Sequence, residues 1–249
     1  FLFLAGERAD PDTIKWAKEK LKVPVIDHWW QTETGFPMLG YPMGLDSPPI
    51  KIGSAGVPMP GFQIEVLGDD GHILGPNKLG SIAVKMPLPP GTLPTLWGAD
   101  ERFKDTYLSH FPGYYETGDA GMKDDEGYVS IMARTDDVIN TAGHRLSTGA
   151  MEEVLTEHPD IAECAVIGVK DELKGQIPIG FICLNAGVNR DPKEIMGEAV
   201  LTVREKIGPV ASFKTAIVVD RLPKTRSGKI LRGTMLKIAN GDDFNIPAT

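Results

Sequence analysis

Apolar positions at the start of the chain follow first a helical and then a strand pattern. Asp10-Pro11 predicts a helix start, because an N-cap residue precedes proline at the first helical position. One face of this helix then carries Ile14, Ala17 and Leu21. The apolar run Val23–Asp27 predicts a buried strand, and polar groups beyond the end of such a strand are where α/β folds bind ligands.

Alternation replaces the helical pattern further along. Phe62, Ile64 and Val66 alternate with polar residues, and Asp69-Asp70-Gly71 predicts a hairpin turn. Ser81–Lys85 predicts another strand. Residues 53–133 therefore predict a small β-barrel or meander. Residues 37–60, which lead into it, and residues 87–94, within it, are rich in Pro and Gly and predict loops.

The pattern changes again at Arg134–Asp137, where we place a domain boundary. Helix and strand patterns are mixed beyond it, which is typical of an α+β domain. The expected elements are a hairpin around Gly143, a helix at about 149–157, strands at 161–169 and 178–184, a helix at 192–206 that begins after Asp191, a strand at 215–219 and a short final helix.

Composition excludes some classes of function. The chain holds 26 basic and 34 acidic residues, has a net charge of −8 and contains no run of eighteen apolar residues, so we expect neither nonspecific nucleic-acid binding nor a membrane span. Its two cysteines, Cys164 and Cys183, lie in apolar strand-like runs and are expected to be buried thiols. Residues 214–237 reverse the charge, with seven Lys or Arg and one Asp, which favours an anionic partner for this strip.

Five polar motifs occur in a fixed order along the chain. They are Asp27-His28-Trp29-Trp30-Gln31-Thr32-Glu33-Thr34-Gly35, Tyr115-Glu116-Thr117-Gly118-Asp119, Arg134-Thr135-Asp136-Asp137, Gly143-His144-Arg145-Leu146 and Thr225-Arg226-Ser227-Gly228-Lys229. The last is not a Walker A loop, because Pro223 stands where the first glycine belongs and Ile230 follows the lysine. Taken together the motifs resemble the adenylate-forming superfamily, and the double tryptophan and Gly-His-Arg-Leu resemble its acetyl/propionyl-CoA synthetase branch. Gly6-Glu7-Arg8 is similar to the propionyl-CoA synthetases.

The resemblance implies a multidomain α/β and α+β architecture. Residues 1–135 would be the C-terminal portion of the large AMP-binding domain, a helix–strand unit plus β-barrel. Residues 136–249 would be the small mobile C-terminal domain, with a hinge at Asp136. The resemblance also implies a C-terminal fragment of a longer enzyme, whose phosphate-gripping loop lies upstream, so that this chain alone is expected to be inactive.

The implied reaction converts a carboxylate, ATP and CoA into acyl-CoA, AMP and pyrophosphate through an acyl-adenylate. The resemblance makes Lys229 the catalytic residue, because a fixed cation stabilises charge that develops at the α-phosphate. Glu33 would bind the Mg²⁺ of ATP, and Trp30 would close the acyl pocket. The residues assigned to ATP or AMP are Gly6, Glu7, Arg8, Asp27, His28, Trp29, Trp30, Gln31, Thr32, Asp119, Arg134 and Arg145.

Further roles follow from the same resemblance. Ala142, Gly143 and Arg204 would bind CoA, and Ala142 stands where acetyl-CoA synthetases often have Ser. Thr156, His158 and Ile161 would hold a second cation. No prosthetic group is implied.

The residues by themselves leave some roles open. Asp119 follows a Thr-Gly turn and is alternatively an Asx-turn residue. Arg204 is alternatively a solvated helical arginine, and His158, before Pro159, a residue at a helix end. Adjacent tryptophans on a strand end point to opposite sides, so one of the pair is alternatively structural.

The predicted protein is a short-chain acyl-CoA synthetase that uses propionate. The alternatives are an acetate–CoA ligase and a non-catalytic nucleotide- or CoA-binding module, and one methylene gives only about 10–200-fold selectivity between acids. Lys229 is also a candidate for lysine acetylation and deacetylation, since acetylation removes its charge. The expected compartment is the cytoplasm, with the mitochondrial matrix as the alternative.

Overall fold

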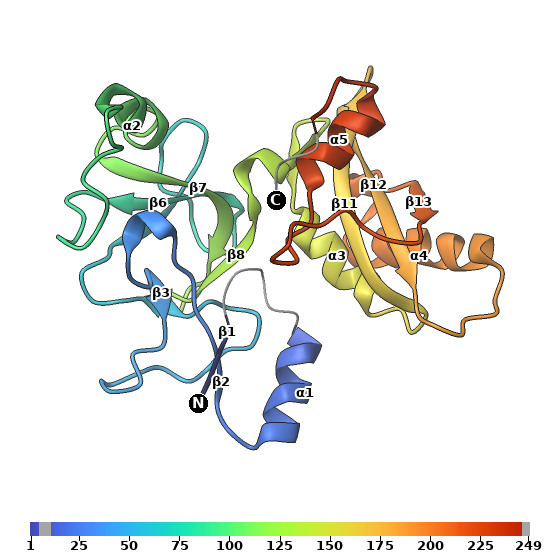
Figure 1. Cartoon of the computed structure of the whole chain (residues 1–249), viewed down its shortest axis with the longest axis horizontal. Helices are drawn as coiled ribbons and strands as arrows, with labels where there is room; N and C mark the ends of the chain where they lie inside the picture. Colours follow the sequence, from blue (N-terminus) through green and yellow to red (C-terminus); the bar gives the residue numbers. More distant parts are fainter. Residues whose placement is uncertain (5–10, 246–249) are drawn as a thin grey trace. The chain divides into compact units, whose positions relative to one another are not determined.

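The structure, a computed structural model, describes residues 1–4 and 11–245. The chain forms two compact units, Phe1–Thr135 (unit 1) and Asp136–Thr249 (unit 2), which Figure 1 shows in different colours along the chain. No helix of the described residues is long and apolar enough to cross a membrane.

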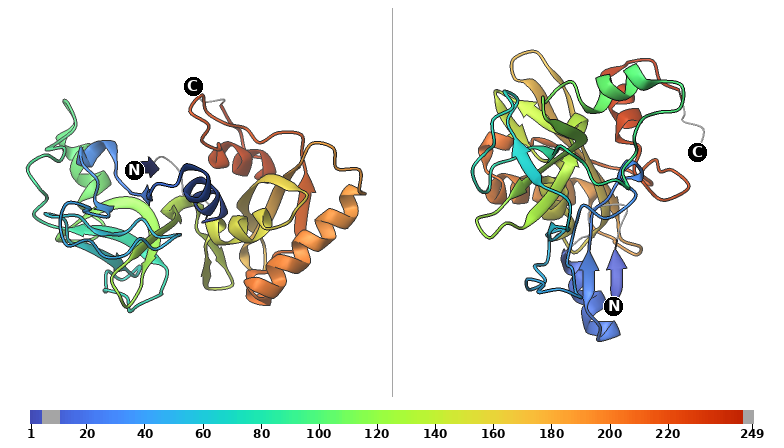
Figure 2. Two further views of the ribbon diagram at one scale, coloured as in Figure 1. Left: turned by 90° about the horizontal axis from the view of Figure 1, so that it is seen from below. Right: turned by 90° about the vertical axis from the view of Figure 1, so that its left-hand side faces the viewer.

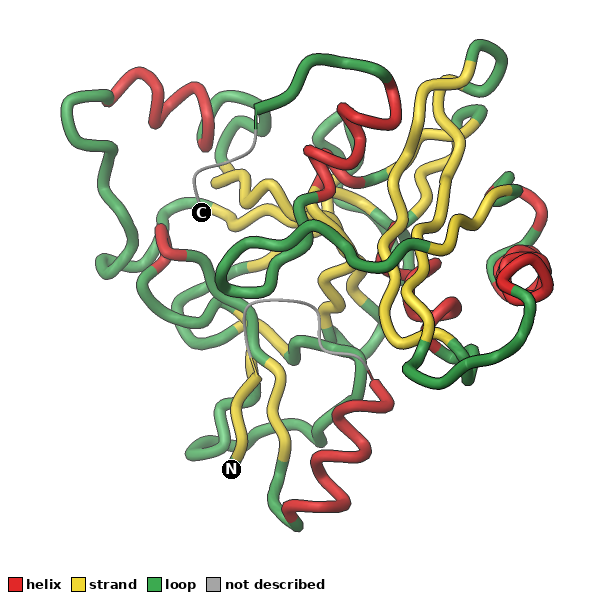
Figure 3. Tube along the Cα trace, turned by 45° about the vertical axis from the view of Figure 1, so that its right-hand side comes forward, coloured by secondary structure: helices red, strands yellow, loops and turns green. Residues whose placement is uncertain are grey.

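Unit 1 begins with the predicted helix–strand unit. Strands β1 (Leu2–Leu4) and β2 (Val25–Asp27) pair in parallel, and helix α1 (Pro11–Leu21) lies beside them (Figures 2 and 3). Ile14 and Ala17 are buried against Val25, as the helical pattern predicts. Leu21, on the same face of the helix, is 54% exposed. It is the last residue of the helix, and the small cluster under α1 ends before it.

A four-stranded antiparallel sheet forms the rest of the framework of unit 1. Its strands, in both chain and spatial order, are β5 (Ile64–Leu67), β6 (Gly80–Lys85), β7 (Tyr114–Lys123) and β8 (Val129–Arg134). Within the described residues β5 and β8 do not pair, so the sheet is an open meander and not a closed barrel. Ile64, Val66, Ile82, Val84 and Tyr115 fill its core.

Shorter elements complete unit 1. They are the 3₁₀ turn η1 (Thr32–Thr34), strands β3 (Leu39–Gly40) and β4 (Val57–Pro58), and helix α2 (Asp100–Tyr107). The sequence pattern did not predict α2, because only Phe103 of its eight residues is buried.

Unit 2 is an α+β unit built on a five-stranded sheet. Its strands are β9 (Ile139–Thr141), β10 (His144–Leu146), β11 (Ile161–Asp171), β12 (Gly175–Leu184) and β13 (Thr215–Val218). β12 pairs antiparallel with β11 and β9 and parallel with β13, and β10 pairs with β9. The helices are α3 (Thr148–Thr156), α4 (Pro192–Lys206) and α5 (Arg232–Asn240), with 3₁₀ turns η2 (Thr135–Asp137), at the junction of the units, and η3 (Pro209–Ala211).

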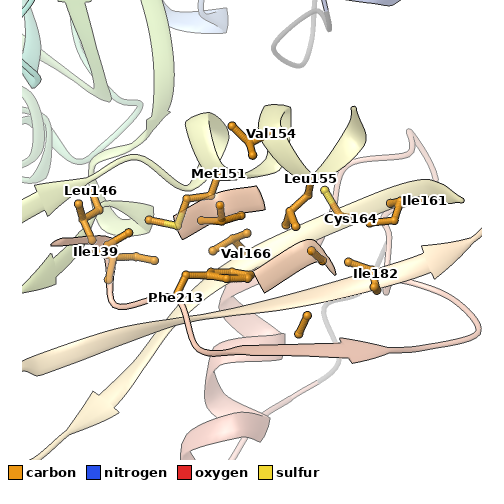
Figure 4. Close-up of a cluster of buried hydrophobic side chains, with 14 of the residues drawn as sticks. Ile139, Leu146, Met151, Val154, Leu155, Ile161, Cys164, Val166, Ile182 and Phe213 are labelled. Atoms are coloured by element: carbon orange, nitrogen blue, oxygen red, sulfur yellow. The ribbon is translucent and has the colours of Figure 1, made fainter. Parts of the chain in front are cut away.

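Alternate residues of β11 and β12 face two different apolar clusters. Val166 and Ile182 contribute to the cluster that α3 and α4 cover (Figure 4), whereas Ile167 and Cys183 face the cluster that α5 covers. Cys164, in the first cluster, and Cys183, in the second, are buried free thiols. The sheet therefore lies between helices on both faces, with α5 on the side opposite α3 (Figure 1).

A charged network fastens α4 to the end of α3. Glu198 on α4 accepts hydrogen bonds from Arg190, and its Oε2 lies 2.8 Å from Nε2 of His158. Hydrogen bonds from Arg190 and then from His158 lower the pKa of Glu198 to about 2. The ordinary value is 4.5, so ionised Glu198 stabilises the fold above about pH 4.5, and this stabilisation is lost as the pH falls from there toward 2.

We expect Glu198→Gln to lower the unfolding midpoint by a few degrees at pH 6, because the uncharged amide loses the ion pair. The difference from wild type should shrink below pH 4 and in high salt, since the pair is exposed. Glu205→Gln, on the same helix and without a hydrogen bond or ion pair in the described part of the chain, is the control. Parallel pH profiles for wild type and Glu198→Gln would contradict this role.

Candidate active site

Gln31 is the centre of a hydrogen-bond network in unit 1. It follows β2 by four residues, and its Nε2 donates to the Thr117 carbonyl at 2.6 Å and to Oδ2 of Asp119 at 2.8 Å. The hydroxyl of Tyr115 donates to its Oε1 at 3.2 Å. One amide thus joins the loop after β2 to strand β7, which carries the Thr-Gly-Asp motif.

The Asp119 carboxylate is buried at the end of this network. It is 8% exposed, its Oδ1 lies 3.3 Å from Nη1 of Arg134, and the neighbouring Trp29 side chain acts to lower its pKa. Burial raises the pKa of Asp119, and the charge of Arg134 and the hydrogen bond from Gln31 oppose this effect. Asp119 is a strand residue, and the described hydrogen bonds of its carboxylate run to Gln31 and Arg134, which is not the pattern of an Asx turn.

Gly118 makes room for Arg134. Its φ is +68°, and a Cβ built on it would lie 2.5 Å from Nη2 of Arg134. The guanidinium therefore lies against the glycine backbone beside Asp119. A larger side chain at Gly118 would be strained and would displace the arginine.

The two adjacent tryptophans have different environments, as the strand geometry predicts. Trp29 is partly buried, packs against the core cluster of the meander and pairs through a backbone bridge with Leu39. Trp30 is 47% exposed. The structure thus leaves the Trp30 ring accessible and gives the Trp29 ring a fixed position next to Asp119.

Two stacked tyrosines hold the loop after β2, and the sequence analysis did not identify either of them. The rings of Tyr107 and Tyr115 lie 5.3 Å apart at 7°. Tyr107 donates to Oε1 of Glu33 at 2.9 Å, as Tyr115 does to Gln31. Tyr115 could have been suspected from its place before the Thr-Gly-Asp motif, whereas Tyr107, on α2, gives no sequence signal.

Other predicted nucleotide residues are less constrained. Thr32 is exposed at the start of η1, and Asp27 ends β2. His28 packs edge-on against Phe3, and its Nδ1 is buried and has no hydrogen-bond partner among residues 1–4 and 11–245. Gly6, Glu7 and Arg8 lie outside the described residues.

In unit 2, Lys229 stands at the end of a tight hairpin. Gly228 has φ +89°, and the Lys229 backbone N–H donates to Oγ1 of Thr225 at 3.1 Å. The side chain is exposed, and its ammonium group has no ion pair within the described residues. A flexible cation presented on a stiff turn is suited to binding an anion.

The hairpin between β9 and β10 presents exposed backbone. Ala142 and Gly143 have φ of +49° and +83°, and both are exposed. The Ala142 N–H donates to the carbonyl of Lys174 at 2.8 Å. Arg145 on β10 is half-buried, whereas Asp136 in η2 and Arg204 on α4 are exposed.

The proposed second cation site finds no support from the His158 ring. Its Nε2 faces Glu198, and its Nδ1 accepts from the backbone N–H of Asp160 at 3.2 Å. Thr156 donates its hydroxyl to the carbonyl of Glu153, and the N–H of Ile161 donates to the His158 carbonyl. In the described part of the chain no three His, Cys, Asp or Glu side chains are grouped as for a metal ion.

Comparison with protein families places this arrangement in a known class. Residues 1–92 match the family described as AMP-binding enzyme, and residues 150–229 match the one described as AMP-binding enzyme C-terminal domain. The chain therefore belongs to the AMP-binding, or adenylate-forming, enzymes.

Within this class the chain is similar to short-chain acyl-CoA synthetases. It is 48% identical over 252 residues to the mitochondrial acyl-CoA synthetase short-chain family member 3 of Mus musculus, covering 100% of this chain and 36% of the relative. It is 45% identical over 248 residues to the propionate–CoA ligase of Escherichia coli K12, covering 97% of this chain and 40% of that enzyme. The chain thus spans about two fifths of the length of these relatives.

The fold agrees with this placement. A crystal structure of the anthranilate CoA ligase AuaEII, in complex with anthranoyl-AMP, is similar with a TM-score of 0.82 and 25% identity. The similarity covers 96% of this chain and 44% of that one.

Proposed function

We propose that the protein containing this chain is an AMP-forming short-chain acyl-CoA synthetase. A carboxylate oxygen attacks the α-phosphorus of ATP and pyrophosphate leaves, which gives an acyl-adenylate. The CoA thiolate then attacks the acyl carbon, and AMP leaves with the electron pair of the broken C–O bond. ATP, CoA and a short carboxylate are the proposed substrates, with Mg²⁺ accompanying the nucleotide.

The observation that carries this proposal is the buried Asp119 carboxylate, held by Gln31 and Arg134 beside Trp29. A carboxylate accepts hydrogen bonds from two hydroxyl groups at once, which suits the two hydroxyls of a ribose. The adjacent indole offers a face on which adenine can stack, worth about 1–3 kcal/mol. Arg134 stands at the same carboxylate and adds positive charge near the nucleotide.

Two further side chains of unit 1 have roles in this proposal, one at the Mg²⁺ and one at the acyl chain. Glu33 is oriented by Tyr107 and supplies the hard oxygen ligand that Mg²⁺ prefers. Trp30, exposed next to Trp29, limits the length of the acyl chain. The relative named propionate–CoA ligase supports propionate as the acid, with acetate as the alternative.

Unit 2 supplies the mobile groups. Lys229 brings its charge to the α-phosphate in the first half-reaction, and the exposed backbone at Ala142-Gly143 receives pantetheine in the second. We assign the change between the two poses to a hinge at Asp136, because a residue at an element end absorbs large φ/ψ changes. Arg204 and Arg145 are the proposed contacts with CoA phosphate and nucleotide phosphate.

The exposure of Lys229 also supports its proposed acetylation. A neutral acetyl-lysine would no longer stabilise charge at phosphorus, so acetylation would switch off the first half-reaction. The bacterial relative supports a cytoplasmic location, and the mouse relative, named mitochondrial, is the reason to keep the matrix as the alternative.

The test measures AMP release by the full-length protein with ATP, CoA and acetate, propionate or butyrate. We expect the highest kcat/KM with propionate. Higher activity with acetate would keep the mechanism and change the substrate. Absence of AMP release with all three acids would overturn the proposal and favour a binding module without turnover.

A further inference from the structure

The hairpin that presents Lys229 is stiff within itself. The N–H of Thr225 donates to the Lys229 carbonyl at 2.8 Å, and the N–H of Gly228 donates to the Thr225 carbonyl at 3.0 Å. Lys224 and Ile230 close the hairpin as an antiparallel bridge. The position of the Lys229 backbone, from which the ammonium group extends, therefore depends on what holds the base of this hairpin.

The base is fixed most firmly on the side that leads into α5. Two residues after the bridge, Arg232 opens α5 and forms a bidentate ion pair with Glu152 on α3. Its Nη2 lies 2.9 Å from Oε2 and 3.0 Å from Oε1, and its Nε lies 3.2 Å from Oε1. The two side chains are only 18% and 16% exposed, so the pair is largely shielded from water and salt.

Glu152 is itself held from a second direction. Its Oε1 accepts the backbone N–H of Val166 in β11 at 2.8 Å. The carboxylate thus fastens α3, the edge of the sheet and the start of α5 at one point. Arg232 lies against a fixed group and not against a mobile surface side chain.

A second ion pair at the same hairpin offers a comparison. Lys224, on the other side of the base, pairs with Glu163 of β11, but both side chains are 37% exposed. Exposed pairs are screened and contribute little to the position of a loop. The difference in burial points to the Glu152–Arg232 pair as the anchor.

Arg232 also borders the segment where unit 2 begins. A cavity of about 20 Å³, the size of one water molecule, is lined by Asp136, Asp137, Gln176 and Arg232 among others. The charge of Asp137 acts on Glu152 as well. The anchor of the lysine hairpin and the proposed hinge segment therefore share one small polar enclosure within unit 2.

We propose that Glu152, acting through Arg232, is a positioning residue that holds Lys229 for the adenylate-forming half-reaction. The proposal rests on the function proposed above for Lys229. A misplacement of about 1 Å at a catalytic group can cost on the order of 10²-fold in rate, so an anchor three residues away matters for this step. The thioester-forming step, in which Lys229 takes no part, does not need the anchor.

The test compares Glu152→Gln with Glu163→Gln in the full-length protein. Glu152→Gln keeps the side-chain shape and the oxygen that accepts the Val166 N–H, but it removes the charge that pairs with Arg232. Glu163→Gln makes the same change at the exposed ion pair with Lys224. For Glu152→Gln we expect a loss of about 10–100-fold in carboxylate-dependent ATP–pyrophosphate exchange. In the same variant, thioester formation from supplied acyl-adenylate should stay within about twofold of the wild-type rate. In Glu163→Gln both half-reactions should stay within about twofold of wild type.

Two more variants separate positioning from a general loss of stability. Arg232→Lys keeps the charge without the bidentate geometry and should lose less exchange activity than Glu152→Gln. The double variant Glu152→Gln/Arg232→Gln should be no worse than the poorer of its two single variants, Glu152→Gln and Arg232→Gln, because the two residues act as one unit. Equal loss of both half-reactions in Glu152→Gln, or full retention of exchange, would overturn the proposal.

Amide hydrogen exchange gives a readout that does not depend on activity. Glu152→Gln should raise the exchange rate of the hairpin amides of Thr225, Gly228 and Lys229 several-fold, while Glu163→Gln leaves them unchanged. If the wild-type protein shows no pyrophosphate exchange with any short carboxylate, the proposed function is refuted. The exchange rates of the hairpin amides still test separately whether Glu152 fixes the hairpin. Unchanged amide protection in Glu152→Gln would refute the positioning role of Glu152.

Discussion

Lys229→Ala in the full-length protein is expected to lower acyl-adenylate formation by about 10²–10³-fold. The reason is electrostatic: negative charge builds up at the α-phosphate and on the new bridging oxygen, and a positioned cation is the group that stabilises it. Lys229 is exposed on a stiff Gly228 turn and has no ion pair in the described structure that would hold it back. The measurement is carboxylate-dependent ATP–pyrophosphate exchange.

Lys229→Ala should form thioester from supplied acyl-adenylate and CoA at a rate within about twofold of wild type. The reason is that, in the proposed mechanism, the second half-reaction uses the Ala142-Gly143 backbone and not Lys229. Arg226→Ala is the matched control, since it removes one positive charge from the same exposed hairpin. A comparable loss in Arg226→Ala would mean that the basic strip acts as a whole. Equal losses of both half-reactions in Lys229→Ala would contradict the alternation of unit 2 between two poses.

Local patterns predicted those elements whose residues carry both periodicity and end signals. Helix α4 runs over Pro192–Lys206 as expected, because Asp191 caps its first turn and proline opens it. The hairpin around Gly143 was found for the same kind of reason, since its turn needs positive φ. In each case the information lies within a few residues of the element.

Elements determined by distant partners were not predictable in this way. β7 carries Gly118 at φ +68° in its middle, so the Thr-Gly-Asp motif looks like a turn. The motif lies at a register shift against β6, and the residues that flank it pair with β6 and β8 and keep the strand continuous. Leu21 fits the helical period but is 54% exposed at the end of α1 and is not part of the apolar cluster that the described residues form there. Tertiary pairing overrides local propensity in both examples.

The same distinction applies to the candidate site. The motifs marked Gln31, Asp119 and Lys229 as chemically interesting, but not that Gln31 hydrogen-bonds Asp119, 88 residues away, or that Arg232 pairs with Glu152 across 80 residues. Tyr107 belongs to a charged helix and acquires its role by stacking on Tyr115 and by its hydrogen bond to Glu33, which is 74 residues away. Residue types predict which chemistry is available, whereas the hydrogen-bond partners of a carboxylate can be identified only from the folded structure.

Asp119→Asn is expected to weaken ATP binding by about 10–100-fold. An uncharged amide has a single acceptor oxygen in place of two ionised ones, so it binds the two ribose hydroxyls less tightly, and a lost hydrogen bond to a charged group is worth about 1.5–3 kcal/mol. The introduced amide would also turn its NH₂ group toward either Gln31 or Arg134, both of which donate to the native carboxylate. Calorimetric titration of the full-length protein with ATP measures the effect directly.

Two observations separate nucleotide binding from a purely structural role of Asp119. Asp125→Asn, in the exposed turn just after β7, is the matched control and should bind ATP as wild type does. Because burial raises the pKa of Asp119, wild-type affinity should fall on acidification at a higher pH than an exposed aspartate would give, and Asp119→Asn should lack this dependence. If Asp119→Asn lowered the unfolding midpoint but bound ATP like Asp125→Asn, the carboxylate would serve only to hold Gln31 and Arg134, and the ribose would have to bind elsewhere.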